Sequence, residues 1–100
     1  MYKSINIKEI DYINNKIVID IRDKYLYNLA HIRNSINIPY NYLYIFPNKY
    51  LNKYSNYYIY CDSGSKSRKM CIYLNKLGYN TIDLIGGYKE YERNTNDIYL

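Results

Sequence analysis

Short apolar segments alternate with segments of helical character along this sequence of 100 residues. The β-branched run at residues 16–21 is long enough for one buried strand, and shorter runs follow at residues 36–38, 57–60 and 81–85. Residues 4–7 have the composition of an additional edge strand. Strands that are separated by helical segments favour a mainly parallel sheet with helices on both faces. The sequence therefore predicts an α/β fold around a central sheet of about five strands.

The clearest predicted helix spans residues 67–77 and ends before Gly78, a typical helix-stop residue. Its spacing places four apolar side chains on one face: Met70, Cys71, Leu74 and Leu77. The other predicted helices lie at residues 23–30, 40–46 and 88–93. Residues 48–56 are expected to be mostly connection.

The length fits a single domain, residues 1–100, with a core built from isoleucines, leucines and some of the 17 tyrosine rings. The amino-terminal residues lack the apolar region of a signal peptide, and no apolar run approaches membrane-spanning length. The two cysteines are too few for a disulfide framework, and no other Cys or His stands at metal-ligand spacing. We therefore expect a cytoplasmic protein with no membrane partner, no metal and no cofactor.

The net charge of +5 is not concentrated in a basic run. The densest group of cations is Lys66, Arg68 and Lys69, which follows a cysteine and a glycine. This arrangement indicates a local anion site more than a track for a long polyanion. The tyrosines are spread evenly and are not set among basic residues, as an aromatic nucleic-acid surface would require. We therefore expect no nucleic-acid partner.

The segment with the most chemistry begins at Cys61, directly after the predicted strand at residues 57–60. In parallel α/β sheets, ligands bind beyond the carboxyl ends of the strands. Gly64 allows a tight turn, so that successive N–H groups face one centre beside the amino end of the next helix. Such a cradle stabilises a thiolate on Cys61 and favours an anionic substrate. The candidate cradle residues are Asp62, Ser63, Gly64, Ser65, Lys66 and Ser67.

Several of these side chains also have a purely structural interpretation. A cysteine at a strand end is often a small core residue, and Cys71 on the apolar helix face is interpreted in that way. The Gly, Ser and Lys that follow Cys61 favour a functional thiol at that position. Lys66 is equally consistent with a solvated loop lysine and with a site cation. His31, the single histidine, is interpreted as a structural side chain that bonds the backbone near a turn.

Asp20 and Arg22 fall on the same side of their predicted strand because strand side chains alternate. They form either an internal ion pair, which we slightly favour, or part of the mouth of the site. Both interpretations place Arg22 near the candidate cysteine loop.

Residues 61–67, Cys-Asp-Ser-Gly-Ser-Lys-Ser, resemble the active-site loop of rhodanese domains, whose common pattern is C-x-x-G-x-R-S. Four further segments resemble motifs of that family in the same order. Residues 19–23 are similar to D-x-R-(D/E), residues 30–39 to G-H-I-P-G-A-x-N-I-P, residues 77–80 to L-G-Y, and residues 84–88 to L-x-G-G followed by an aromatic residue. Each motif is weak alone, but the five together span nearly the whole chain.

The resemblance implies a three-layer α/β/α rhodanese-like fold and a sulfurtransferase activity. It implies that Cys61 carries sulfane sulfur as a persulfide, and that residues 62–66 form the anion cradle. The implied donor is thiosulfate or a persulfide, and the implied acceptor is a thiol or cyanide. A protein of a sulfur relay is a further partner of this kind. The sequence does not separate a relay from a thiosulfate enzyme.

This sequence departs from the family pattern at several positions. Lys66 stands where arginine is common, which keeps the charge but loses the bidentate fork. Ala30 replaces a glycine, Leu26 replaces an acidic residue, and Arg33 with Asn34 replaces a Pro-Gly turn. These departures concern substrate preference more than the fold.

Two other function classes compete with sulfur transfer. A phosphatase or arsenate reductase of related architecture needs a cysteine, five residues and then an arginine that grips a tetrahedral oxyanion. Here Arg68 stands one residue too late, and a loop that closes at Lys66 is shorter and suits a single sulfur better. A non-enzymatic partner-binding module would not need Cys61.

Overall fold

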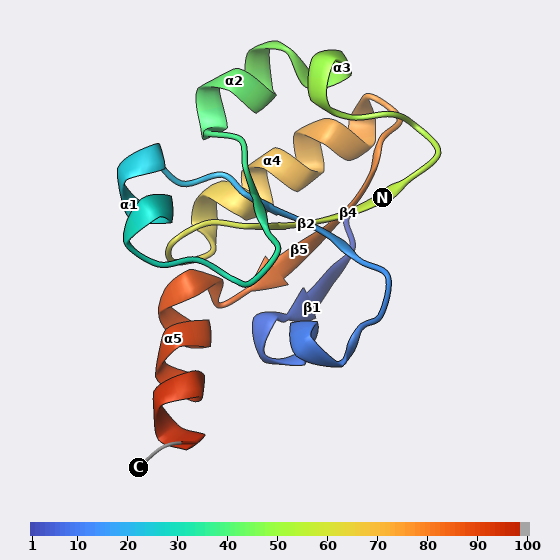
Figure 1. The fold of residues 1–100 in the computed structure, drawn as a ribbon. Coiled ribbons are helices and arrows are strands. Elements are labelled where there is room, and N and C mark those ends of the chain that lie inside the picture. The colour runs from blue at the N-terminus through green and yellow to red at the C-terminus, as the bar shows by residue number, and fades with distance from the viewer. Residues whose placement is uncertain (99–100) are drawn as a thin grey trace.

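The computed structural model describes the backbone of residues 1–98 and the side chains of residues 1–94. Its centre is a five-stranded sheet in the order β1-β5-β4-β2-β3, in which every neighbouring pair of strands is parallel (Figure 1). The strands are β1 (Ser4–Asn6), β2 (Ile17–Asp20), β3 (Ile36–Asn37), β4 (Asn56–Tyr60) and β5 (Asn80–Ile85). The predicted parallel α/β sheet of about five strands is therefore confirmed.

Helices connect the strands. They are the 3₁₀ helix η1 (Ile7–Tyr12) and the α-helices α1 (Lys24–Leu29), α2 (Tyr40–Ile45), α3 (Pro47–Tyr50), α4 (Ser65–Lys76) and α5 (Gly87–Ile98). The prediction that residues 48–56 are mostly connection is wrong at its start, because Pro47 opens α3 with a fixed φ that suits a first helical residue. η1 was not predicted. Within residues 1–98, no helix has the length and apolar character needed to cross a membrane.

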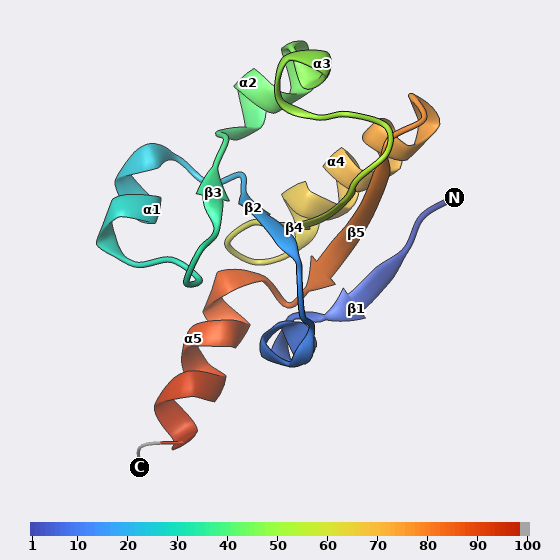
Figure 2. The same cartoon turned by 45° about the vertical axis from the view of Figure 1, so that its right-hand side comes forward.

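The sheet separates two apolar clusters, as the alternation of strand side chains requires. On one face, strand residues pack against α2 and α4: Ile19, Ile59, Leu43, Met70 and Leu74. On the other face, strand residues pack against η1 and α5: Val18, Tyr60, Leu84, Ile7, Ile10 and Tyr88. Figure 2 shows α2, α3 and α4 on one side of the sheet and α5 with η1 on the other. The three-layer α/β/α arrangement is thus confirmed.

The predicted apolar face of α4 is correct for three residues and wrong for the fourth. Met70, Cys71 and Leu74 are fully buried, whereas 42% of Leu77 is exposed. Leu77 is the carboxyl-terminal cap, and the chain turns away at Gly78 with a φ of 99°. The turn takes the Leu77 side chain off the stripe that faces the sheet.

The carboxyl ends of β2, β4 and β5 meet at one edge of the sheet. Ile21, just after β2, donates its N–H to the carbonyl of Tyr60 at 3.0 Å, which joins the end of β2 to the end of β4. Tyr88, just after β5, donates its N–H to the carbonyl of Cys61 at 2.8 Å. The segments that follow these three strands are thereby brought together at one place.

Leu74 and Leu77 provide a matched test of this packing. We expect Leu74→Ala to lower the free energy of unfolding by about 2–5 kcal/mol, because it opens a cavity between α4 and the sheet. Leu77→Ala removes a side chain that is largely in solvent, and we expect a loss of no more than about 0.5–1 kcal/mol. Urea unfolding followed by circular dichroism measures both, and equal losses would contradict the described helix face.

Candidate active site

Cys61 lies immediately after β4 and is 4% exposed. Its Sγ accepts two backbone hydrogen bonds, from the N–H of Gly64 at 3.1 Å and from the N–H of Ser67 at 3.3 Å. Gly64 has a φ of 109°, a left-handed conformation that favours glycine, and it forms the cap that precedes α4. Donors of this kind stabilise a negative charge on sulfur. The loop therefore places two backbone N–H donors on Cys61 Sγ at the start of α4.

The structure brings the predicted cradle residues together in two roles. Gly64 and Ser67 supply the N–H groups on the sulfur. The other four line a cavity of about 250 Å³ that also reaches Cys61: Asp62, Ser63, Ser65 and Lys66. α4 begins at Ser65, two residues earlier than predicted, so Ser65 and Lys66 belong to its first turn.

The cavity has walls that the sequence analysis did not assign to the site. They are Ile21, Asp23, Leu26 and Tyr40, with Arg22 at the position where a site-mouth role was considered. The apolar members of this wall come from the end of β2, from α1 and from the start of α2. No short motif marks them, because they reach the cavity only through the packing of three separate segments.

Arg22 forms the predicted ion pair with Asp20 and also lines the cavity. Its guanidinium forms a buried ion pair with Asp20, with Nη2 2.8 Å from Oδ2, and also donates to the carbonyl of Ala30. Nη1 lies 3.9 Å from Asp62 Oδ1, and the guanidinium carbon lies 4.3 Å from the centre of the Tyr88 ring. Arg22 is only 7% exposed. Its charge is therefore largely compensated within the protein, although its side chain lines the cavity.

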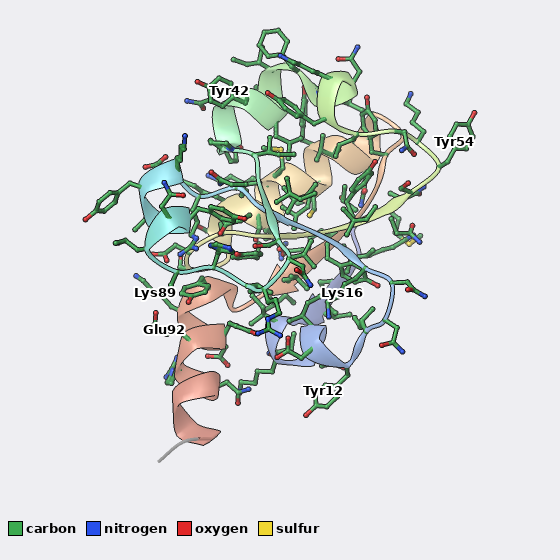
Figure 3. All side chains as sticks on the ribbon, viewed as in Figure 1. Tyr12, Lys16, Tyr42, Tyr54, Lys89 and Glu92 are labelled. Carbon is green, nitrogen blue, oxygen red and sulfur yellow. The ribbon has the colours of Figure 1, made fainter. Side chains whose placement is uncertain are left out.

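The first turn of α5 holds the cysteine loop from the other side. The N–H groups of Tyr88 and Lys89 donate to the carbonyls of Cys61 and Asp62, at 2.8 and 3.1 Å. Because C=O and N–H point in opposite directions across a trans peptide, the following N–H groups face away from α5. Lys89, labelled in Figure 3 on the first turn of α5, also places its Nζ 3.5 Å from Asp62 Oδ2.

Gly87 makes this contact possible. Its φ is 70°, and a Cβ at this position would lie 2.5 Å from the carbonyl oxygen of Asp62 and 2.7 Å from the carbonyl carbon. Any side chain would therefore push the backbone of the cysteine loop away from α5. Gly87 belongs to the segment at residues 84–88 that resembles a family motif, but only the fold shows which backbone it contacts.

Behind the sulfur lies a buried carboxylate that the sequence analysis did not assign to the site. Cys61 Sγ is 3.5 Å from Ser67 Oγ, and Ser67 Oγ donates to Asp83 Oδ1 at 2.6 Å. The hydroxyl of Tyr2 donates to Asp83 Oδ2. Burial, reinforced by the hydrogen bond to Asp83, raises the pKa of Tyr2 to about 12. Asp83 is 1% exposed in β5. The available sequence signal was a carboxylate between Ile82 and the apolar pair Leu84 and Ile85.

Cys71 and His31 occupy structural positions, as predicted. Cys71 is fully buried in α4, and burial raises the pKa of its thiol to about 12. His31 Nδ1 is 2.7 Å from the carbonyl of Tyr27, and its ring stacks on the Tyr27 ring with centroids 3.7 Å apart. His31 is not among the residues that line the cavity at Cys61.

Arg68 does not line the cavity either. Its guanidinium carbon lies 5.1 Å from the centre of the Tyr2 ring, on the Asp83 side of the loop. In residues 1–94, no group of three His, Cys, Asp or Glu side chains is placed to hold a metal ion. Apart from the paired Arg22, the reactive or charged groups at the cavity are the Cys61 thiol, the exposed Lys66 and the carboxylates of Asp23 and Asp62.

Comparisons with known proteins agree on one family. A family model described as Rhodanese-like domain matches residues 4–94. Adenylyltransferase and sulfurtransferase uba4 of Ogataea parapolymorpha is 35% identical over 77 residues, which are 76% of this chain and 20% of that protein. The chain thus spans about a fifth of the length of this curated relative.

Solved structures resemble about nine tenths of the chain. A rhodanese-related protein from Thermoplasma volcanium is 32% identical with a TM-score of 0.80, over 92% of this chain and 93% of that one. A rhodanese-like domain protein from Staphylococcus aureus is 26% identical with a TM-score of 0.78, over 89% and 90% of the two chains.

Gly87→Ala tests the support that α5 gives to the cysteine loop. We expect the substitution to raise the pH midpoint of Cys61 alkylation by about one unit, because the displaced loop loses N–H donors to the anionic sulfur. Alkylation by iodoacetamide as a function of pH, with peptide mapping to separate Cys61 from Cys71, gives the midpoint.

Gly78→Ala is the matched control. Gly78 also has a positive φ, 99°, but its Cβ would meet only the end of the Lys53 side chain at 3.5 Å or more. Both variants should lose about 1–3 kcal/mol of stability from backbone strain, measured by thermal unfolding. Only Gly87→Ala should shift the pH midpoint of Cys61 alkylation. An equal shift in both variants would refute the idea that α5 holds the cysteine loop in place.

Proposed function

Because this chain belongs to the rhodanese-like domain family, we propose that it is a sulfurtransferase domain that carries sulfane sulfur as a persulfide on Cys61. The observation that carries the proposal is the pair of backbone N–H groups on Cys61 Sγ, at the wall of a cavity lined by Lys66. A partner-binding module without chemistry would have no use for a sulfur held in this way.

The reaction has two balanced steps. In loading, the Cys61 thiolate attacks the outer sulfur of thiosulfate, the S–S bond of thiosulfate breaks, and sulfite leaves with that electron pair. In unloading, cyanide or a thiolate attacks the terminal sulfur of the persulfide, and Cys61 leaves as a thiolate. Neither step needs an oxidant or a cofactor. The N–H groups of Gly64 and Ser67 stabilise the thiolate that starts the first step and ends the second.

We propose that Lys66 is the cation that binds the sulfur donor. Arg22 also lines the cavity, but Asp20 and the carbonyl of Ala30 already use its Nε and Nη2 donors, and its Nη1 lies 3.9 Å from Asp62 Oδ1. Within residues 1–94, no carboxylate forms an ion pair with Lys66, whose side chain is exposed at the cavity. A dianion such as thiosulfate therefore meets an uncompensated positive charge next to Cys61.

We also propose which sulfur donors and acceptors the domain uses in the cell. The relative from Ogataea parapolymorpha carries the name sulfurtransferase, which supports sulfur transfer here and leaves a protein persulfide or a relay protein as partner beside thiosulfate. A reducing cytoplasm would keep Cys61 and Cys71 as the free thiols seen in the structure. The position of Arg68 outside the cavity argues against phosphate chemistry, which would need its guanidinium beside Cys61.

Intact mass after incubation with thiosulfate tests the carrier directly. We expect the protein to gain one sulfur atom and to lose it again when cyanide is added. Cys61→Ser should abolish the gain, whereas Cys71→Ser should keep it, because Cys71 is fully buried with a raised pKa. Sulfur loading that persists in Cys61→Ser would refute the assignment.

Lys66→Ala tests the cation. We expect kcat/KM for thiosulfate to fall roughly fivefold, which corresponds to a loss of about 1 kcal/mol of transition-state stabilisation. The loss should appear mainly as a higher KM, because an exposed lysine acts through a screened charge. Lys66→Arg should keep most of the activity, since it keeps the charge.

Lys69→Ala is the control for the Lys66 variants, because Lys69 is an exposed residue of α4 that does not line the cavity. Its kcat/KM for thiosulfate should stay at the wild-type value. Equal losses in Lys66→Ala and Lys69→Ala would mean that the basic surface acts only as a diffuse field.

A further inference from the structure

Asp83 is a buried carboxylate that the proposed sulfur chemistry does not use. We propose that Asp83 is a positioning residue: it directs the Ser67 hydroxyl proton away from Cys61 and thereby disfavours the thiolate. The charged group of this network sits two hydrogen-bonding steps from the sulfur, because Asp83 contacts Ser67 and Ser67 contacts Cys61.

The geometry indicates that Asp83 is ionised. Both of its oxygens accept from hydroxyl groups, Oδ1 from Ser67 at 2.6 Å and Oδ2 from Tyr2. An ionised carboxylate is an acceptor only, and a hydroxyl bonded to it at 2.6 Å has the short distance typical of a charge-assisted bond. Tyr2, whose pKa is raised to about 12 by burial and by Asp83, stays a donor.

Ser67 has a single hydroxyl proton and three nearby acceptors. Asp83 Oδ1 lies at 2.6 Å, the carbonyl of Gly64 at 3.1 Å and Cys61 Sγ at 3.5 Å. The short bond to the carboxylate takes the proton, so Ser67 Oγ turns a lone pair toward the sulfur. In that state Ser67 can accept from a Cys61 thiol but cannot donate to a Cys61 thiolate. The anionic sulfur therefore keeps its two N–H donors but receives no third hydrogen bond from the Ser67 hydroxyl.

Asp83 therefore disfavours the Cys61 thiolate in two ways. It places a negative charge near the thiolate, and it withholds the donor that the thiolate would otherwise receive. Arg68 and Tyr2 are the other charged or titratable groups on the Asp83 side of the loop. On the cavity side, the corresponding groups around Cys61 are Arg22, Asp23, Tyr40, Asp62 and Lys66. Cys71, on α4, and Tyr88 and Lys89, on α5, are further titratable groups close to the loop.

The network is spatially separate from the substrate cavity. Asp83 and Tyr2 line a hollow of about 170 Å³ on the other side of the loop, together with Ser63, Gly64 and Arg68. Neither Asp83 nor Tyr2 lines the cavity at Cys61. A substitution at Asp83 therefore changes the state of the sulfur without removing a wall of the site that receives the donor.

A double-mutant cycle on Asp83 and Ser67 tests the proposal, with the pH midpoint of Cys61 alkylation by iodoacetamide as the readout. We expect Asp83→Asn to lower the midpoint by about one unit, because the amide is neutral and no longer outcompetes an anionic sulfur for the Ser67 proton. In the Ser67→Ala background, Asp83→Asn should lower it by only about half as much, since the charge is removed but no hydroxyl is left to redirect.

Asp62→Asn is the control for a general charge effect. Asp62 is a carboxylate of the same loop that pairs with Lys89 and Arg22 and has no bond to Ser67. Asp62→Asn should shift the alkylation midpoint by the same amount in the wild-type background and in the Ser67→Ala background. An Asp83→Asn shift that is also equal in the two backgrounds, or a rise of the midpoint, would overturn the proposal.

Tyr2→Phe provides a second route if Asp83→Asn does not fold, as judged by circular dichroism. Loss of the Tyr2 hydroxyl leaves the Asp83 charge with Ser67 as its remaining hydroxyl donor, so the midpoint should rise, and a fall or no change would overturn the proposal. The functional meaning of this effect of Asp83 on Cys61 rests on the proposed sulfur-carrier function, but the alkylation test uses no sulfur donor. If the wild-type protein failed to load sulfur, that function would be refuted, and the double-mutant cycle would still test the role of Asp83.

Discussion

The bonds between the start of α5 and the cysteine loop are the interaction on which the rest of the site depends. Two N–H groups of α5 hold the carbonyls of Cys61 and Asp62, and Gly87 lets the two backbones approach within contact distance. With those carbonyls turned toward α5, the loop can close over the sulfur from Gly64 onward. The segment after β5 thus shapes a candidate site whose cysteine follows the end of β4.

Buried charge is arranged differently on the two sides of the sulfur. On the cavity side, Arg22 is neutralised by Asp20 and by a backbone carbonyl, so the accessible positive charge is that of Lys66. On the opposite side, Asp83 is held by hydroxyl groups from Ser67 and Tyr2. In the proposed function, Lys66 favours the arrival of an anion on the cavity side, while Asp83 limits how much negative charge the sulfur holds before the anion arrives.

Much of this protein could be predicted from its sequence because the signals are local. Short β-branched runs separated by helical segments indicated a parallel sheet, and the loop from Cys61 to Ser67 follows a strand and contains the glycine that its left-handed turn needs. Cys71 was correctly placed in the core by helical spacing. Leu77 was wrongly placed there, because spacing alone does not reveal where the helix turns away at Gly78.

The sequence by itself determined the fold class and the candidate cysteine loop, since strand and helix periodicity and a Cys-x-x-Gly pattern are visible within a few residues. The tertiary structure decided what surrounds that residue. Asp83 is 22 positions from Cys61 and Tyr2 is 59 positions from it, and no local pattern links either one to the sulfur. They come together because β1 and β4 both pair with β5, which places side chains from three strand regions at one point. The proposed sulfur chemistry follows from the composition of the loop, whereas the proposed control of the sulfur follows from the strand order.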